Sequence, residues 1–220
     1  SVPHLGGHTH ALGVCVGAFS INFMMFLRPW KVPDPRSVAH AGVGAFNLVR
    51  TALYRRAGGH EPIRQRPDDD IQLGRLMKRF GPSEFLFGAG ALSVAWYPDV
   101  PAYIRGLEKN AFAGVGYRAW MVLGGVAAHA LFFLGPLAAL WLASGPAWWA
   151  SLASVALMLG LAVDHTRFAG GRWWWGLFFP VGVAVLDYIL LRSMVLTLLR
   201  RGIVWRGTHY PLRELRANRL

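Results

Sequence analysis

The sequence predicts a mixed α/β domain joined to membrane-spanning helices. Three observations predict this architecture: charged and turn-forming residues concentrate in residues 1–118, three long apolar runs fill residues 119–199, and residues 200–220 form a basic tail. Of the 220 residues 54% are hydrophobic. A soluble domain rarely holds three such runs in succession, so we interpret residues 119–199 as membrane helices.

The formal net charge is +12, mostly from arginine. Such an excess suits a membrane protein whose cytoplasmic face meets anionic lipid. The basic residues are scattered around the apolar runs and form no continuous stripe, so we expect no nucleic-acid partner. Cys15 is the single cysteine, which leaves no disulfide framework. The chain begins with Ser1 and shows no signal peptide, and we expect the N-terminal part of a longer protein to precede it.

The first elements are a helix, a loop and a short strand. Residues 10–27 are apolar but interrupted by Gly, Ser and Asn, and they are marginal in length for a span of ~20 residues. We predict a helix that lies at the membrane surface or in a core beside it. A proline-rich loop follows. Residues 42–50, GVGAFNLVR, predict a glycine turn that enters a strand, and residues 51–57 a short helix ended by Gly58 and Gly59.

The next elements lead to the membrane. Residues 70–80 carry apolar side chains at helical spacing, and Gly81 ends the predicted helix. Residues 84–98 predict a strand and a turn. Residues 99–114 predict an amphipathic helix that Asp99 caps.

Three spans are predicted, at residues 119–142, 147–163 and 173–195, each near the ~20 residues that a bilayer core requires. Tryptophans gather near their ends, as is typical of membrane interfaces. The loop after the first span is uncharged and suits the outside, whereas residues 164–172 and the tail carry arginines and suit the inside. Three full spans would place the tail opposite residues 1–118. Either this charge preference is overridden or one apolar run does not cross.

Three consecutive acids, Asp68, Asp69 and Asp70, precede the predicted helix at residues 70–80. An isolated acidic run at this place is commonly a helix start, which the helix dipole and free N–H groups stabilise. Here the run stands between GVGAFNLVRTALYRRAGGH upstream and RGLEKNAFAG downstream, and the tail contains GIVWRGTHYPL.

This ordered set resembles the second half of the catalytic domain in membrane-bound family 2 glycosyltransferases, such as ceramide glucosyltransferases and the hopanoid- and carotenoid-associated enzymes. The resemblance covers most of residues 40–118 and 200–214. It implies the C-terminal half of a GT-A-like domain followed by about three transmembrane helices. The matching positions are Gly44, Arg50, Gly58 and Gly59 in a glycine–arginine stretch, and Asp69, Asp70 and Leu73 in an E-D-x-x-L motif, with Asp69 where the family usually has glutamate.

The resemblance implies an inverting transfer of a hexose from a nucleotide-sugar to a membrane lipid. Asp70 is the expected general base, with Asp69 as its neighbour, and such a base is typically worth ~10²–10⁴ in rate. Like charges at close range raise one pKa. The N–H groups of the following helix are expected to keep Asp70 ionised.

Further residues are expected to bind substrate. Arg105 and Lys109 would face either the diphosphate or lipid headgroups. The tail motif would close over the active site or lie at the membrane interface. The full set is Asp68, His60, Gly44, Asn47, Arg105, Lys109, Asn110, Trp205 and Arg206.

The family implies a divalent metal, Mg or Mn, held by a D-x-D motif. The run at residues 68–70 matches D-x-D formally, but the family places that motif before the glycine–arginine stretch. We therefore expect the metal ligands outside this chain and none within it.

Two other functions stay open. A processive polysaccharide synthase of the same family would need more spans, and a non-catalytic membrane scaffold would need no base. The expected location is the bacterial plasma membrane, as a multi-pass integral membrane protein with its catalytic part in the cytoplasm.

Overall fold

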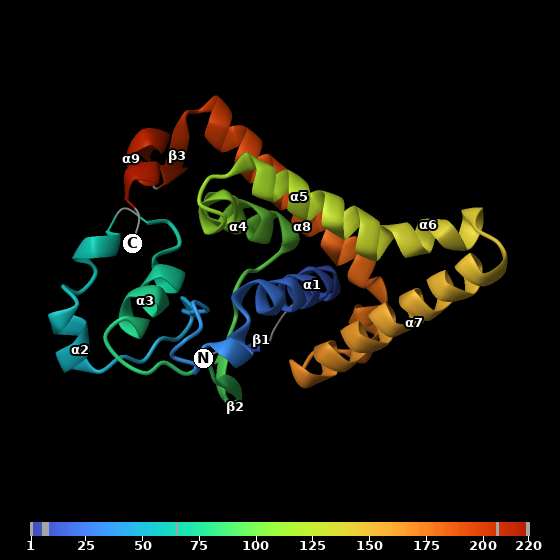
Figure 1. Cartoon of the computed structure of the whole chain (residues 1–220), viewed down its shortest axis with the longest axis horizontal. Helices are drawn as coiled ribbons and strands as arrows, with labels where there is room; N and C mark the ends of the chain where they lie inside the picture. Colours follow the sequence, from blue (N-terminus) through green and yellow to red (C-terminus); the bar gives the residue numbers. More distant parts are fainter. Residues whose placement is uncertain (1, 6–8, 65, 206, 219–220) are drawn as a thin grey trace. The chain divides into compact units, whose positions relative to one another are not determined.

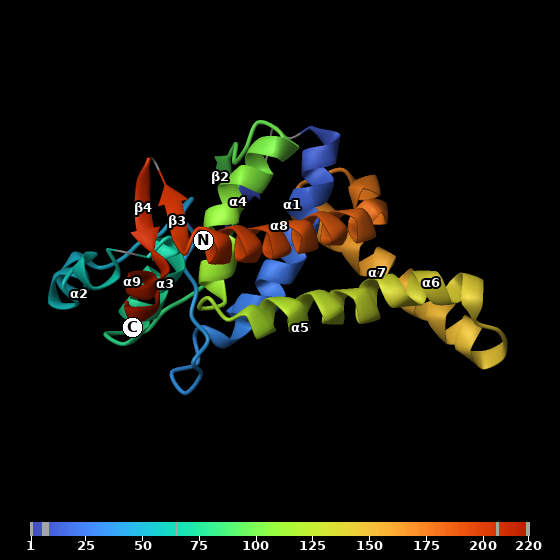
Figure 2. The same cartoon turned by 90° about the horizontal axis from the view of Figure 1, so that it is seen from above.

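The computed structural model describes residues 2–5, 9–64, 66–205 and 207–218, and these are mostly helical (Figures 1 and 2). The chain divides into two compact units. Unit 1 comprises Ser1–His4, Phe23–Val94 and Leu196–Leu220. Unit 2 comprises Leu5–Asn22 and Ala95–Val195. The basic tail therefore belongs to the same compact unit as the acidic run.

Unit 1 holds short helices around a small core. Its helices are α2 (Thr51–Arg56), α3 (Asp69–Lys78) and α9 (Leu212–Ala217), with the 3-10 turns η1 (Pro29–Lys31) and η2 (Glu61–Ile63). The core is made by the buried face of α3 with side chains from the preceding loop: Ala57, Ile63, Leu73, Leu76 and Met77. The helical spacing of the apolar residues in α3 predicted this face.

Two small sheets accompany these helices. β1 (Val2–Leu5) pairs with β2 (Phe87–Val94), and β3 (Gly202–Trp205) pairs with β4 (Thr208–Pro211). The second pair is antiparallel, with Trp205 opposite Thr208. Gly207 has a φ of 80°, in the left-handed region that glycine adopts without steric cost. The tail motif is thus a β-hairpin, and α9 packs against it.

Unit 2 holds the long apolar helices. They are α1 (His10–Leu27), α4 (Val100–Gly114), α5 (Ala119–His129), the π-helical segment η3 (Ala130–Leu134), α6 (Gly135–Leu142), α7 (Gly145–Phe168), the 3-10 segment η4 (Trp173–Phe178) and α8 (Phe179–Leu199). Figures 1 and 2 both show α6 beside α7, to which it is joined by a two-residue connection.

Four helices in the described residues are long and apolar enough to cross a membrane: His10–Lys31, Ala119–Leu142, Gly145–Phe168 and Trp173–Leu199. The chain is a membrane protein by this criterion. The bounds of the first predicted span are confirmed, and the other two are longer than predicted. The remaining segment, His10–Lys31, contains residues 10–27, which were predicted as a helix of marginal length for a span.

The core of unit 2 lies between α1, α4 and α8. Leu12 and Ile189 are fully buried there with Tyr103. A Cβ on Gly182 would come within 2.5 Å of the Ala18 Cβ, so glycine lets α8 approach α1 closely. Asp99 caps α4 as predicted, accepting a hydrogen bond from the Ala102 N–H at 2.7 Å.

Two charged pairs join the helices of unit 2. His129 Nδ1 of α5 lies 2.6 Å from Asp187 Oδ1 of α8. Arg192 Nε of α8 donates to Glu108 Oε2 of α4 at 2.8 Å. Charged groups among apolar helices normally find such partners. They fix α8 against both α4 and α5.

One predicted element is wrong. Residues 42–50 form no strand, and the segment is irregular. The Val43 N–H donates to the Asn47 side chain at 3.1 Å, within the segment itself. The described residues contain only two-stranded sheets, so a GT-A-like domain stays a prediction.

Candidate acid–base site at the start of helix α3

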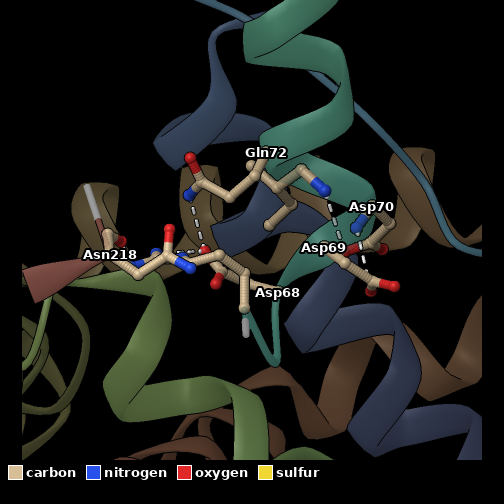
Figure 3. A network of polar contacts seen from close by, with 7 residues as sticks. Asp68, Asp69, Asp70, Gln72 and Asn218 are labelled. Carbon is tan, nitrogen blue, oxygen red and sulfur yellow. Dashed lines mark hydrogen bonds and ion pairs between the residues drawn. The ribbon is translucent and has the colours of Figure 1, made fainter. Parts of the chain in front are cut away.

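The three acids have three different environments. Asp68 is 2% exposed, Asp69 is exposed and Asp70 is half-buried. Figure 3 shows Asp68 with Gln72 and Asn218 on one side of the helix start, and Asp69 with Asp70 on the other. The sequence places the acids together, and the turn into α3 separates their side chains.

Asp68 is held entirely within unit 1. Its Oδ2 accepts hydrogen bonds from Arg66 Nη2 at 2.8 Å and from Gln72 Nε2 at 2.7 Å. Arg66 Nη1 donates in turn to the Asn218 carbonyl at 3.4 Å. Removing one partner of such a buried ion pair strongly destabilises the fold, because the other charge stays buried without a partner. These contacts hold the tail to α3, and the predicted role of Asp68 in substrate binding stays a prediction.

Asp70 is the best-oriented acid for chemistry. Its Oδ2 accepts the Gly44 N–H and its Oδ1 accepts the Ile71 N–H, both at 2.8 Å. Burial raises the pKa of Asp70, and the nearby charges of Asp69 and Asp68 add to this, while the two N–H groups act against it. The two N–H groups favour the ionised carboxylate as expected, and the raised pKa shows that desolvation outweighs them.

Asp69 supports the geometry of its neighbour. Its Oδ1 accepts the Asp70 N–H at 3.0 Å, while the rest of the side chain is exposed. It therefore orders the first turn of α3 and contributes negative charge beside Asp70. The expected role of Asp69 as the neighbour of a general base stays a prediction.

Glycines bring the loop at residues 41–44 onto the α3 backbone. A Cβ on Gly42 would lie 1.7 Å from the Asp70 carbonyl oxygen, and one on Gly74 would lie 1.9 Å from the Ala41 carbonyl oxygen. Neither glycine could carry a side chain unless the facing backbone moved away. The expected tight turn is present at Gly44, where the Phe46 N–H donates to the Val43 carbonyl at 3.0 Å, although neither Gly42 nor Gly44 has positive φ. Close backbone approach is what these positions require.

The remaining predicted residues of unit 1 have local partners. Asn47 Oδ1 holds the loop through the Val43 N–H. His60 is exposed, and its Nδ1 lies 2.5 Å from the Tyr54 hydroxyl. Trp205 lies in β3 and is 42% exposed. Arg206 lies outside the described residues.

Three predicted residues belong to unit 2. Arg105, Lys109 and Asn110 lie on α4, and Arg105 is exposed. The Asn110 Oδ1 is buried and has no hydrogen-bond partner in the described part of the chain. The structure therefore brings Gly44 to Asp70 and holds Asn47 in the same loop, and it places Arg105, Lys109 and Asn110 on a different compact unit.

His40 and Lys78 near the acids were not predicted. Lys78 Nζ donates to the carbonyls of Val32 at 2.9 Å and Ala39 at 2.6 Å, which fastens the preceding loop to α3. Burial lowers the pKa of His40, the positive charges of Arg75 and Lys78 lower it further, and Asp68 opposes this. A lone histidine in a proline-rich loop carries no sequence signal, because only the folded loop brings it toward α3.

Among the described residues, no three His, Cys, Asp or Glu side chains are grouped to hold a metal ion. The metal that the resemblance implies has no fitting ligand set among these residues.

Comparisons with models of protein families, with curated proteins and with solved structures find no match for this chain. They assign no family. The resemblance to glycosyltransferases rests on the sequence motifs.

Proposed function

We propose that this chain is the C-terminal part of a membrane-bound family 2 glycosyltransferase that moves a hexose from a nucleotide-sugar to a membrane lipid with inversion. The observation that carries the proposal is the Asp70 carboxylate, half-buried and held on both oxygens by backbone N–H groups. The motif resemblance assigns the general base to this same residue.

The chemistry fits a carboxylate in this setting. Asp70 takes the proton of the acceptor hydroxyl. At the same time the oxygen of that hydroxyl bonds to the anomeric carbon of the sugar, and the nucleoside diphosphate leaves. Each carboxylate oxygen has a second lone pair, so it accepts the substrate proton while keeping its backbone hydrogen bond. A base works best when its pKa lies near the working pH, and burial moves Asp70 in that direction.

A lipid acceptor is supported by the four apolar helices, since an amphiphile presents its polar end without leaving the bilayer. The nucleotide-sugar site and the Mg or Mn ligands are proposed to lie outside this chain. The catalytic part faces the cytoplasm of a bacterial plasma membrane, because the basic segments favour that side.

The test is Asp70→Asn in the full-length protein. Membranes that contain the variant are incubated with labelled nucleotide-sugars, and sugar incorporated into extracted lipid is measured. We expect a loss of ~10²–10⁴-fold, since the amide cannot take the proton. Membrane insertion is expected to stay unchanged.

The matched control is Glu84→Gln, which neutralises an exposed carboxylate in the same unit. It is expected to retain full transfer. Unchanged turnover in Asp70→Asn would refute the base assignment. If the unmodified protein transfers no sugar to lipid, the polysaccharide synthase and the scaffold become the functions to examine.

A further inference from the structure

The number of membrane crossings is constrained by unit 1. This compact unit contains Ser1–His4, Phe23–Val94 and Leu196–Leu220. Arg66 donates to the Asn218 carbonyl, and α9 buries Leu215 to 1% exposure. A bilayer cannot pass between segments that pack together in one core. All three segments therefore lie on the same side of the membrane.

This constraint applies first to α1. The strand β1 precedes α1 and pairs with β2, which follows it. A single helix between two segments on one side cannot cross, although its length and composition would allow it. One face of α1 packs in the core of unit 2, through Leu12, Cys15 and Val16.

The constraint applies next to the three apolar segments between Val94 and Leu196. Their ends lie on one side, so an even number of them crosses. The segments Ala119–Leu142 and Gly145–Phe168 are 6% and 11% buried, whereas Trp173–Leu199 is 44% buried. The first two form a hairpin whose tip exposes Trp141 and Leu142 at 90% and 85%. Lipid is the partner that suits such side chains.

The later half of the third segment, α8, is held to α4 by polar contacts. Ser193 accepts the Phe112 N–H of α4 at 3.1 Å and donates to the Glu108 carbonyl, and Arg192 pairs with Glu108. These contacts place the later half of α8 beside α4. Since α4 ends five residues before α5 begins, it lies at the entry side of the membrane.

We infer that the chain crosses the bilayer twice, through α5–α6 and α7, and that α1 and α8, which pack with α4 and with these two spans, do not cross completely. Charge agrees with this arrangement: the connection at residues 143–144 carries no charge, while Arg167, Arg172 and the tail arginines share the side of unit 1. Three full spans would place the basic tail opposite residues 1–118, whereas two crossings place both on the same side.

The test locates single cysteines in the full-length protein on a Cys15→Ala background. Thr51→Cys reports unit 1, Ser144→Cys the hairpin tip, Ala169→Cys the end of α7, and Ala217→Cys the tail. Intact cells are treated with a membrane-impermeant maleimide before and after permeabilisation. We expect Ser144→Cys to be labelled in intact cells, and the other three only after permeabilisation.

Labelling of Ala217→Cys on the same side as Ser144→Cys would overturn the inference, because α8 would then cross. A second measurement covers variants that label poorly. A reporter that is active only in the cytoplasm should be active when it is fused after residue 220. Activity of a periplasmic reporter at the same position would also overturn the inference. Sugar transfer is no part of either readout, so failure of this inference and failure of the proposed function are distinguishable.

Discussion

Three adjacent aspartates differ here because burial differs from one side chain to the next. Asp68 is buried and pairs with Arg66, and Asp69 is exposed. Asp70 is half-buried and accepts hydrogen bonds from two backbone N–H groups. The raised pKa of Asp70 also has a consequence for stability. Because folding favours its protonated form, the stability from this group is full below the ordinary carboxyl pKa and is lost as pH rises through the raised pKa.

The Gly44→Ala variant tests how Asp70 is positioned. The new Cβ would lie 3.1 Å from Asp70 Oδ2, which must shift by a few tenths of an ångström. We expect kcat to fall by about 10-fold with little change in KM, since small misplacements of a catalytic group are costly. The hydrogen bond from Gly44 opposes the raised pKa, so weakening it should move the acid limb of the pH–rate profile to higher pH.

The pH–rate profile of purified full-length enzyme checks this prediction. Gly125→Ala is the control, because a Cβ there meets nothing within 4 Å. An acid limb that stays in place in Gly44→Ala would show that the Gly44 N–H does not tune the carboxylate.

At the scale of elements, α3 depends on a loop that has no regular structure. Residues 41–44 lie against its first turns through backbone contacts, and Lys78 fastens the earlier part of the loop at the other end of the helix. Gly74 is a poor helix former, yet it is required where the Ala41 carbonyl approaches α3. Glycine at position 74 lowers the intrinsic stability of the helix, but it allows the loop to pack directly on α3.

The Gly74→Ala variant separates these two effects. Helix propensity alone would favour alanine by about 0.5–1 kcal/mol. The overlap with the Ala41 carbonyl forces the loop away from α3, and overpacking of this kind typically costs about 1–3 kcal/mol. We expect a lower midpoint of thermal unfolding in detergent and reduced transfer. A variant that is more stable than the parent would contradict the close approach, and Gly125→Ala again provides the helix-interior control.

At the scale of the whole molecule, the chain returns after its membrane segments to complete the unit that holds the acids. The hairpin β3–β4 and α9 belong to unit 1, and α9 meets the Asp68 network through Asn218. The tail packs within the unit that holds the three acids, which is the arrangement expected if it docks there. Distant parts of the sequence are thereby joined in one core.

Truncation after residue 211 tests this connection. It removes α9 with the buried Leu215, whose burial is worth about 1.5–3 kcal/mol. We expect faster proteolysis within residues 23–94 and loss of transfer, with membrane insertion retained. Arg213→Ala, an exposed position on α9, should behave as the parent. An unchanged proteolysis pattern after truncation would argue against the docking.

The sequence by itself determined the elements that depend on local pattern. Helical spacing located α3 and α4, the length of the apolar runs located the membrane helices, and Asp99 marked a helix start. Strand propensity gave a wrong prediction at residues 42–50. Their composition is typical of a strand, but the backbone of this segment packs against α3 and has no partner strand. Local propensity is a weak guide when packing against another element decides the conformation.

Only the tertiary structure decided which aspartate is buried, which is held by backbone donors, and where the tail lies. These properties depend on contacts between segments far apart in sequence, such as Arg66 with Asn218 and Gly44 with Asp70. No local pattern encodes them, because desolvation and charge pairing depend on what the folded chain brings near each group.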